Sequence, residues 1–303
     1  MKNETLSIVH TKVFASAPQG GNPCPVVFGG ENLSTEHMQA LAAEFGEETV
    51  FVLPPENPEA DIRLRYFVPN HEMEMCVHAT VGAATVLKKK GTITKPTIKV
   101  ETPLGIITVK YAANANEFDI TVEQFPPVFS SHVPSRSQIA SALGIDESDI
   151  DESVSPIQSV STSRAKLIVP VRSEGIVHAM EPDFEKLWSL CDEFEVTGVY
   201  PYALKEQGTN PVASARQFPR RAGYNEDPAT GVAASALGAY LANYNVVGGD
   251  DSSEWTSVTI QQGDAMGKPS VLHAECTMRD SEIIKTQIRG QAAIVSEEEK
   301  IHT

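Results

Sequence analysis

Two stretches of small, apolar residues constrain this chain more than any other feature of its sequence. Residues 79–87 can be aligned with residues 229–237 with five identities and one exchanged Val/Gly pair. Each stretch has the composition of a helix that is apolar all round, and such a helix is normally buried in the middle of a protein. A strand, a turn and a second strand are predicted after each stretch, centred on Gly105 and on Gly267. The repeat therefore predicts two similar α/β halves, each with a buried central helix.

The length and charge of the chain limit its functions. Its 303 residues are about twice the length of a typical domain, so we expect two domains. The formal net charge of -16 disfavours nucleic acids and anionic membrane surfaces as partners. No apolar stretch is long enough to cross a membrane, and the first residues lack the pattern of a signal peptide. The four cysteines are scattered without a CxxC pair, which fits a reducing compartment, so we expect a cytoplasmic protein.

Local patterns predict the elements around the first small-residue stretch. Ser34 can cap a helix whose apolar residues fall on one face and which ends at Gly46. Residues 49–53 are rich in β-forming side chains. Residues 61–67 alternate apolar and polar side chains with the period of a half-exposed strand. A second helix is predicted over residues 79–90.

A cluster of polar residues precedes this second helix: His71, Glu72, Glu74, Cys76 and His78. On a strand, the last three would share one face and could chelate a divalent ion. The favoured alternative is a strand with its polar residues turned outward, and we predict no metal site. Cys76 as a nucleophile would need a base, for which His78 is in range, whereas a buried, inert thiol is favoured. The sequence also contains no dinucleotide-binding, P-loop or nucleophile-elbow motif, which disfavours nucleotide and serine-hydrolase chemistry.

Two acidic pairs stand at the ends of predicted elements. Glu47 and Glu48 lie where a helix gives way to a strand, either as a solvated connector or with one carboxylate turned into the interior for proton transfer. Glu226 and Asp227 precede the second small-residue stretch. Capping of that helix would explain Asp227 without any chemistry.

Several segments occur together in an order and spacing that resemble one protein family. They are Gly21-Asn22-Pro23, Glu48-Thr49-Val50-Phe51, and residues 65–72, 76–80, 216–219, 226–231 and 262–270. The ordered set resembles the PhzF-like (phenazine biosynthesis) family over roughly residues 6 to 295. Each segment alone is a weak signal, whereas the ordered set is a strong one.

The resemblance implies an α/β (α+β) fold of the diaminopimelate epimerase-like type. Such a fold has two pseudo-symmetric domains, each a β-barrel-like sheet around a central helix, with the active site in the cleft between them. The family's final strand commonly returns to the first domain. We therefore assign residues 1–122 plus 285–303 to the N-terminal domain and residues 123–284 to the C-terminal domain. The resemblance also implies a homodimer.

Individual residues can be matched to the family's motifs. Glu48 matches the general acid/base, with Glu47 where the family usually has Ser. His78 and Asp227 match the two further residues implied in catalysis. The implied substrate-binding residues are Asn22, Val77, Thr230, Gly231 and Val232.

The chain departs from the family's pattern at two of these positions. Val77 replaces a Gly, so a requirement for positive φ would strain the backbone there. Val232 replaces a Ser whose hydroxyl would help to bind a substrate carboxylate. Both changes make the family's best-known substrate doubtful for this chain, but they leave Glu48, His78 and Asp227 intact.

The resemblance favours a cofactor-independent isomerase that moves a proton between carbons of a small carboxylate-bearing metabolite. In this hypothesis Glu48 abstracts a carbon-bound proton, and the N-terminal ends of the two small-residue helices hold the substrate carboxylate. One alternative is an amino-acid racemase or epimerase with two thiols. Cys76 resembles the first thiol, but the second position falls at Pro228, which cannot carry a proton. The other alternative is a non-catalytic metabolite-binding protein.

Overall fold

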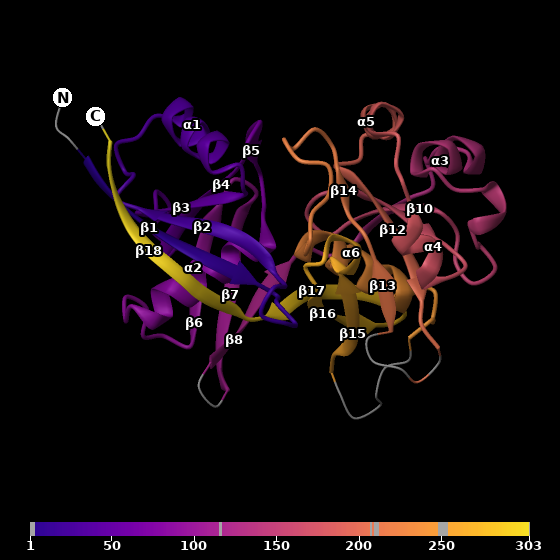
Figure 1. The fold of residues 1–303 in the computed structure, drawn as a ribbon. Coiled ribbons are helices and arrows are strands. Elements are labelled where there is room, and N and C mark those ends of the chain that lie inside the picture. The colour runs from indigo at the N-terminus through magenta and orange to yellow at the C-terminus, as the bar shows by residue number, and fades with distance from the viewer. Residues whose placement is uncertain (1–3, 115–116, 207, 209–211, 248–253, 303) are drawn as a thin grey trace. The chain divides into compact units, whose positions relative to one another are not determined.

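The computed structural model describes residues 4–114, 117–206, 208, 212–247 and 254–302. The chain divides into two compact units (Figure 1). The first comprises Met1–Ala15, Gly21–Glu123 and Arg289–Thr303, and the second comprises Ser16–Gly20 and Gln124–Ile288. Each unit is a mixed α/β structure with one buried helix, which confirms the predicted fold class.

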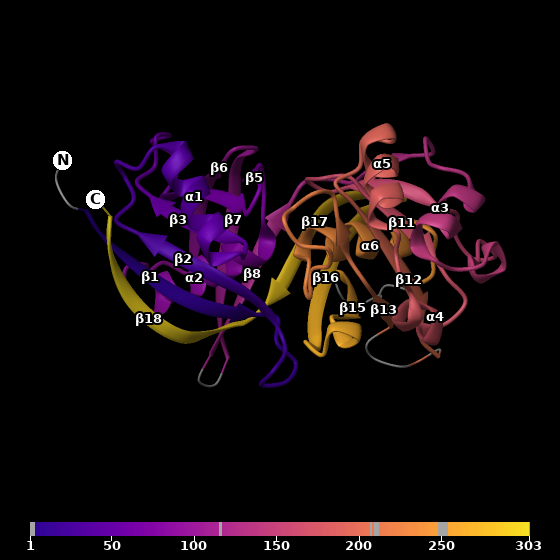
Figure 2. The same cartoon turned by 45° about the horizontal axis from the view of Figure 1, so that its top comes forward.

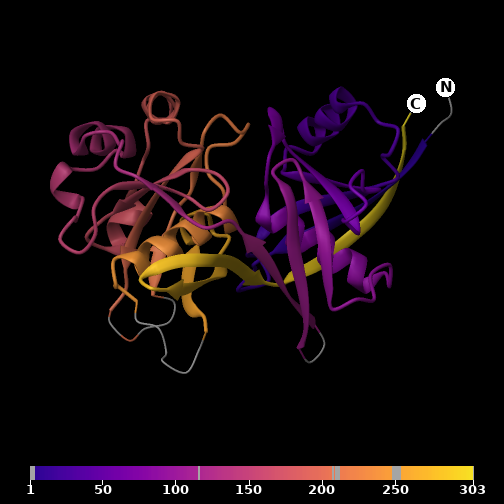
Figure 3. The ribbon, with the colours of Figure 1, turned by 180° about the vertical axis from the view of Figure 1, so that it is seen from behind.

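The first unit is a strand-rich structure in which both ends of the chain pair with each other. Its strands are β1 (Glu4–Val13), β2 (Asn22–Phe28), β3 (Thr49–Leu53), β4 (Ile62–Val68), β5 (His71–Met73), β6 (Thr97–Thr102), β7 (Gly105–Asn114), β8 (Glu117–Gln124) and β18 (Ala292–His302). The C-terminal strand β18 runs antiparallel along β1, and Figure 3 shows the two side by side. The order then continues through β2, β3 and β4, with β2 and β3 parallel. The strands β6, β7 and β8 form an antiparallel meander beside β4.

Helix α2 (Val77–Lys89) is the central element of the first unit, and its first eleven residues are all buried. It packs against β1, β2, β3 and β18. Small side chains permit this close packing, because a Cβ atom added at Gly82 would lie 2.8 Å from Oγ1 of Thr11 in β1. The buried helix predicted from the first small-residue stretch is therefore confirmed, although it begins two residues before Ala79.

Helix α1 (Thr35–Phe45) lies on the outside of the same unit, against β3 and β4 (Figure 2). The side chain of Ser34 accepts a hydrogen bond from the His37 N–H, and Gly46 ends the helix in the left-handed conformation with φ of 67°. Both capping residues predicted from the sequence are thus confirmed.

The second unit contains the remaining elements. Its strands are β9 (Val128–Ser130), β10 (Gln158–Ser161), β11 (Lys166–Pro170), β12 (Gly198–Leu204), β13 (Ala213–Ala215), β14 (Phe218–Pro219), β15 (Thr256–Gln262), β16 (Ser270–Arg279) and β17 (Glu282–Gly290). Its helices are α3 (Arg136–Leu143), α4 (Glu174–Ala179), α5 (Phe184–Glu193) and α6 (Gly231–Asn243), with short 3₁₀ turns at Glu147–Asp149 and Asp264–Met266. Helices α3 and α5 contact each other over the core formed around β11 and β12.

Helix α6 is the central element of the second unit, and it is buried from Gly231 to Ala242. It packs against β10, β11, β15 and β16. A Cβ atom at Gly238 would lie 2.6 Å from Cβ of Ala274 in β16, so a small residue is required here as in α2. Whereas α2 begins two residues before Ala79, α6 begins two residues after Ala229. The two helices therefore share composition and burial. In the sequence alignment, however, α6 begins about one helical turn later than α2.

Each central helix follows an arginine–glutamate pair with the same geometry. Arg65 binds both carboxylate oxygens of Glu72, and its guanidinium lies 5.2 Å from the centre of the Phe67 ring. In the second unit, Arg216 binds both oxygens of Glu226 in the same way, 4.9 Å from the Phe218 ring. The shared arrangement extends the internal similarity beyond the helices.

Among the described residues, no helix combines the length and apolar character needed to cross a membrane.

Candidate functional site

Glu48 lies in the short connection between α1 and β3. The left-handed turn at Gly46 redirects the chain, and β3 begins directly afterwards at the buried Thr49. The Glu48 side chain is 11% exposed, so its carboxylate is turned largely away from solvent. Of the two interpretations of this acidic pair, the structure supports an inward-facing carboxylate rather than a solvated connector.

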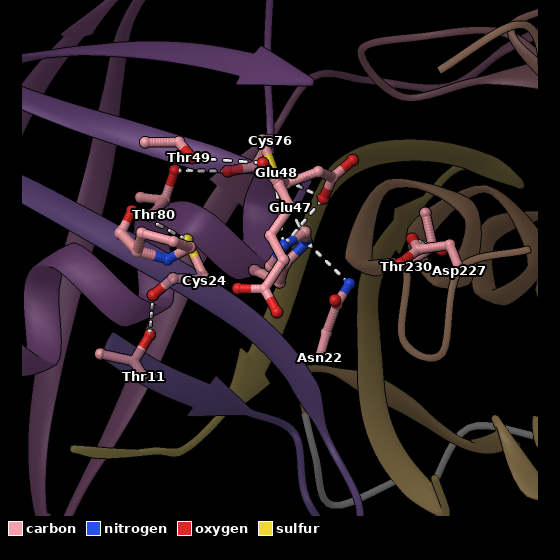
Figure 4. Close-up of polar contacts among 12 residues, drawn as sticks. Thr11, Asn22, Cys24, Glu47, Glu48, Thr49, Cys76, Thr80, Asp227 and Thr230 are labelled. Carbon is pink, nitrogen blue, oxygen red and sulfur yellow. Dashed lines mark hydrogen bonds and ion pairs between the residues drawn. The ribbon is translucent and has the colours of Figure 1, made fainter. Parts of the chain in front are cut away.

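His78 is the second residue of α2, and its ring is 2% exposed. The ring Nε2 lies 2.8 Å from Oε2 of Glu48. On the other side of the ring, Nδ1 lies 3.3 Å from the amide nitrogen of Asn22. An amide NH₂ group only donates hydrogen bonds, so Nδ1 accepts and the ring proton lies on Nε2. His78 therefore donates from Nε2 to the Glu48 carboxylate, and Asn22 orients the ring. Figure 4 shows the side chains of Asn22, Glu48 and Cys76 in this region.

Cys76 completes the group of side chains around Glu48. Its Sγ lies 3.5 Å from Oε2 of Glu48, to which the thiol donates, and 3.3 Å from Nδ1 of His78. The strand predicted through Glu74, Cys76 and His78 is wrong, because β5 ends at Met73 and Cys76 is the N-cap of α2. A helix start, rather than the alternation of a strand, brings Cys76 and His78 together.

Behind this group, a chain of buried hydroxyls holds the first turn of α2. Thr80 donates from Oγ1 to the Cys76 carbonyl at 2.7 Å, and the Tyr66 hydroxyl lies 2.8 Å from the same Oγ1. Since the Thr80 proton is already used, Tyr66 is the donor in the second bond. Burial raises the pKa of Tyr66, so the phenol stays protonated. Sequence patterns gave no sign of this support, which joins β4 to the helix start.

Cys24 lies close to the two acidic residues without being part of the group. Burial raises the pKa of its thiol well above the ordinary value, and the negative charges of Glu48 and Glu47 raise it further. Its carbonyl accepts a 2.8 Å hydrogen bond from Oγ1 of Thr11. Cys24 is therefore a neutral thiol in a region of negative potential.

The start of α2 lacks a side-chain cap. The N-cap residue Cys76 makes no capping hydrogen bond with its side chain, in contrast to Ser34 at the start of α1. The first turn of a helix presents N–H groups and the positive end of the helix dipole, which together favour an anion. Val77 adopts helical backbone angles and no positive φ, so the strain considered for a valine at this position is absent.

The predicted residues of the second unit gather at the start of α6. Asp227 is 4% exposed and accepts a hydrogen bond from the Thr230 hydroxyl. The alternative that Asp227 caps the helix is wrong, because Thr230 is the N-cap residue and Asp227 lies three residues earlier. Gly231 and Val232 form the first turn, and Thr230 makes no side-chain cap. As at α2, the backbone N–H groups of this turn are suited to an anion.

Gln262 organises this second helix start and was not singled out as a site residue by the sequence. Its Nε2 donates to the Asp227 carbonyl at 2.7 Å, and its Oε1 accepts from the Tyr200 hydroxyl at 2.9 Å. The same Oε1 lies 3.3 Å from the Thr230 nitrogen. Burial and the charge of Asp227 raise the pKa of Tyr200, which keeps the phenol a donor. The only sequence signal for Gln262 is its place in the segment that ends at Ser270.

Of the sequence-predicted residues, the structure brings Asn22, Glu48, Val77 and His78 together in the first unit. It places Asp227, Thr230, Gly231 and Val232 together in the second. The catalytic and substrate-binding roles of these residues stay predictions.

Comparison with known proteins gives the relationships of the chain. Residues 11–298 match the sequence model of the PhzC-PhzF family, described as phenazine biosynthesis-like protein. The chain is 33% identical to the uncharacterized isomerase YddE of Escherichia coli (strain K12) over 291 residues, covering 95% of this chain and 96% of that protein. It is 29% identical to the trans-2,3-dihydro-3-hydroxyanthranilate isomerase of Pseudomonas aeruginosa, covering 94% and 95% of the two chains.

A solved structure resembles the whole chain. The phenazine biosynthesis protein of the PhzF family from Bacillus anthracis superposes with a TM-score of 0.87 and 32% sequence identity, covering 100% of both chains. The resemblance inferred from the ordered motifs is thereby confirmed.

Proposed function

Because the chain belongs to the phenazine biosynthesis-like (PhzC-PhzF) family and is an isomerase, we propose that it moves a proton between two carbons of a small carboxylate-bearing metabolite without a cofactor. One observation carries this proposal. The carboxylate of Glu48 is largely withdrawn from solvent and is held by the Nε2 proton of His78 at 2.8 Å. A carboxylate in such a position is suited to proton transfer at carbon.

In the proposed reaction Glu48 begins as a carboxylate, because His78 and Cys76 both donate hydrogen bonds to it. It removes a proton from one carbon of the substrate, and the electron pair of the broken C–H bond is delocalised over the conjugated system. The protonated Glu48 then delivers a proton to another carbon of that system, and exchange of this carboxyl proton with solvent beforehand lets deuterium enter the product. The enzyme ends in its starting state, with no net oxidation or reduction. His78 acts as a positioning residue that fixes the carboxylate between the two carbons.

The substrate carboxylate would bind to the backbone N–H groups at the start of α2. Val77 and His78 provide these groups in the first turn, and their positive dipole end favours a negative charge. Binding there would hold the reacting carbon beside Glu48. Negative charge that develops on the substrate during proton abstraction would be stabilised by the same fixed dipoles.

The name of one relative supports a proposal about the substrate class. The Pseudomonas aeruginosa relative is named for an isomerisation of trans-2,3-dihydro-3-hydroxyanthranilate, a cyclic amino carboxylate. We propose cyclic or amino carboxylates with a conjugated system as the class for this chain. Val232 supplies no hydroxyl at the start of α6. We therefore propose a substrate that needs fewer hydrogen bonds at this position than that compound. The predicted substrate contacts of Asp227, Thr230 and Gly231 belong to the same proposal.

The experiment that tests this function is deuterium uptake from heavy water into a panel of such carboxylates, followed by mass spectrometry. The wild-type protein is compared with Glu48→Gln, which keeps the shape of the side chain but removes the base. Uptake into at least one compound that is lost in the variant supports the proposal. Uptake that continues unchanged in Glu48→Gln would overturn the role of Glu48. Tight binding of a panel compound without any uptake would favour a metabolite-binding protein instead.

A further inference from the structure

The group formed by Glu48, Cys76 and His78 combines three kinds of metal ligand. Among the residues that the structure describes, these three are the one set of histidine, cysteine and acidic side chains whose ligand atoms all lie within 4.8 Å of one another. Thiolate sulfur, imidazole nitrogen and carboxylate oxygen are the ligands that zinc takes in proteins. We propose that a thiophilic divalent cation such as Zn²⁺ binds these three side chains and blocks the proposed catalytic carboxylate.

One of the three ligand distances matches a tetrahedral ion, and the other two come within about half an ångström of it. Zinc bonds of about 2.3 Å to sulfur and about 2.0 Å to nitrogen and oxygen place neighbouring ligand atoms roughly 3.3 to 3.6 Å apart. The Cys76 sulfur lies 3.5 Å from Oε2 of Glu48, and 3.3 and 4.0 Å from the two ring nitrogens of His78. The contact between Nε2 and Oε2, at 2.8 Å, is a hydrogen bond. An ion that replaces its proton requires the carboxylate to withdraw from Nε2, and the sulfur to approach Nε2, by about half an ångström each, which side-chain rotation supplies.

The surroundings of the group suit such a site. With zinc on Nε2, the ring gives up its Nε2 proton to solvent and takes one up on Nδ1, so it stays neutral, and Asn22 can accept the Nδ1 proton by turning its amide oxygen toward the ring. Cys76 is the N-cap of α2, so the positive end of the helix would offset part of the negative charge of a metal-bound thiolate. Three protein ligands leave a fourth position for water or for the substrate carboxylate.

Binding exchanges a proton for the metal. The S–H bond of Cys76 breaks, its proton passes to solvent, and the sulfur electron pair forms the bond to zinc. Glu48 provides its bond from the ionised carboxylate and His78 from the neutral ring, so the two ligand anions balance the charge of the ion. Since binding releases a proton, affinity rises with pH. A lone pair of Glu48 is then held by the metal and cannot accept a proton from carbon, so the ion acts as an inhibitor.

Co²⁺ is the probe that tests the site without any activity measurement. Titration of the full-length protein is expected to give a sulfur-to-cobalt charge-transfer band in the near ultraviolet and the strong visible bands of a four-coordinate ion, at one ion per chain. Zn²⁺ is expected to displace them. Cys76→Ser should lose the charge-transfer band and bind at least about tenfold more weakly. Cys276→Ser, which removes a buried thiol of the second unit, should leave the spectrum unchanged. Glu48→Gln should weaken binding but keep the band.

Two results would overturn the metal site: a wild-type spectrum with no sulfur-to-cobalt band, or a band that persists in Cys76→Ser. Because inhibition rests on the proposed function, the spectra and the deuterium assay are read separately. Cobalt binding, together with no deuterium uptake by the metal-free protein, would uphold the metal site and overturn the isomerase proposal. Uptake that neither Zn²⁺ nor Co²⁺ suppresses, in a protein with no sulfur-to-cobalt band, would uphold the isomerase and overturn the metal site.

Discussion

The ring of His78 donates to Glu48 across 2.8 Å, although the two residues are thirty positions apart in the chain. This bond ties the connection that follows α1 to the first turn of the buried helix α2. Because α2 is packed tightly between strands, the imidazole is a rigid donor, and the carboxylate on the more open connection takes its position from the ring. In the proposed reaction, His78 therefore fixes the position of the carboxylate, and Glu48 transfers the proton.

Replacement of His78 by Ala is expected to lower kcat while leaving KM within a few-fold of the wild type. The carboxylate would lose the donor that fixes it, and a displacement of about 1 Å at a reacting group can cost on the order of a hundredfold in rate. His78→Gln, whose amide can still donate, should recover part of the loss. Steady-state kinetics on a substrate found by the deuterium assay measure both constants. An equal rate for the Ala and Gln variants would contradict the positioning role.

The predicted tautomer of His78 depends on Asn22. Asn22→Asp replaces a donor at 3.3 Å from Nδ1 by an acceptor, so Nδ1 should acquire a proton while Nε2 keeps its own. We expect a cationic ring and a loss in kcat of at least about tenfold, because the charge holds the Glu48 carboxylate more tightly. Nitrogen-15 NMR of the histidine rings reports the protonation of each nitrogen. Signals of His37 on the surface helix α1 serve as the internal control, and an unchanged His78 spectrum would refute the assignment.

The sequence predicted the local elements of this region better than its contacts. The capped helix α1 and the buried helix α2 follow from patterns within a few residues, namely a serine cap, a glycine end and a run of small side chains. Local patterns make the Glu47–Glu48 pair and His78 candidates among open alternatives, whereas the choice of Glu48 and His78 as catalytic residues rests on the ordered motifs that match a family. The sequence pattern predicts a strand at Cys76, because alternating polar residues mimic a period of two. Its contact with Glu48 depends on how β3 lies beside α2, which is a property of the tertiary fold.

The hydroxyl chain behind α2 gives a prediction about stability. Thr80→Val removes the acceptor of the buried Tyr66 hydroxyl and the donor to the Cys76 carbonyl. An unsatisfied buried hydroxyl costs about 1 to 3 kcal/mol, so the free energy of unfolding should fall by that amount. Thr80→Ser keeps both hydrogen bonds and should lose less. Urea denaturation of the two variants measures the difference. A valine variant as stable as the serine variant would show that these hydroxyl hydrogen bonds contribute nothing to stability.

The two arginine–glutamate pairs should differ in their contribution to stability. Arg216 also donates to the backbone carbonyls of Val177 and Met180, and its pair with Glu226 is the more buried, with side chains 10% and 14% exposed. Arg65 and Glu72 are 14% and 30% exposed, so solvent can screen the charge left behind when Arg65 is lost. Arg216→Met should cost roughly 3 to 5 kcal/mol, and Arg65→Met about 1 to 3 kcal/mol. Adding Glu226→Gln to Arg216→Met removes the unpaired charge and should recover part of the loss. Urea denaturation of all three proteins decides the order, and a larger cost for Arg65→Met would contradict it.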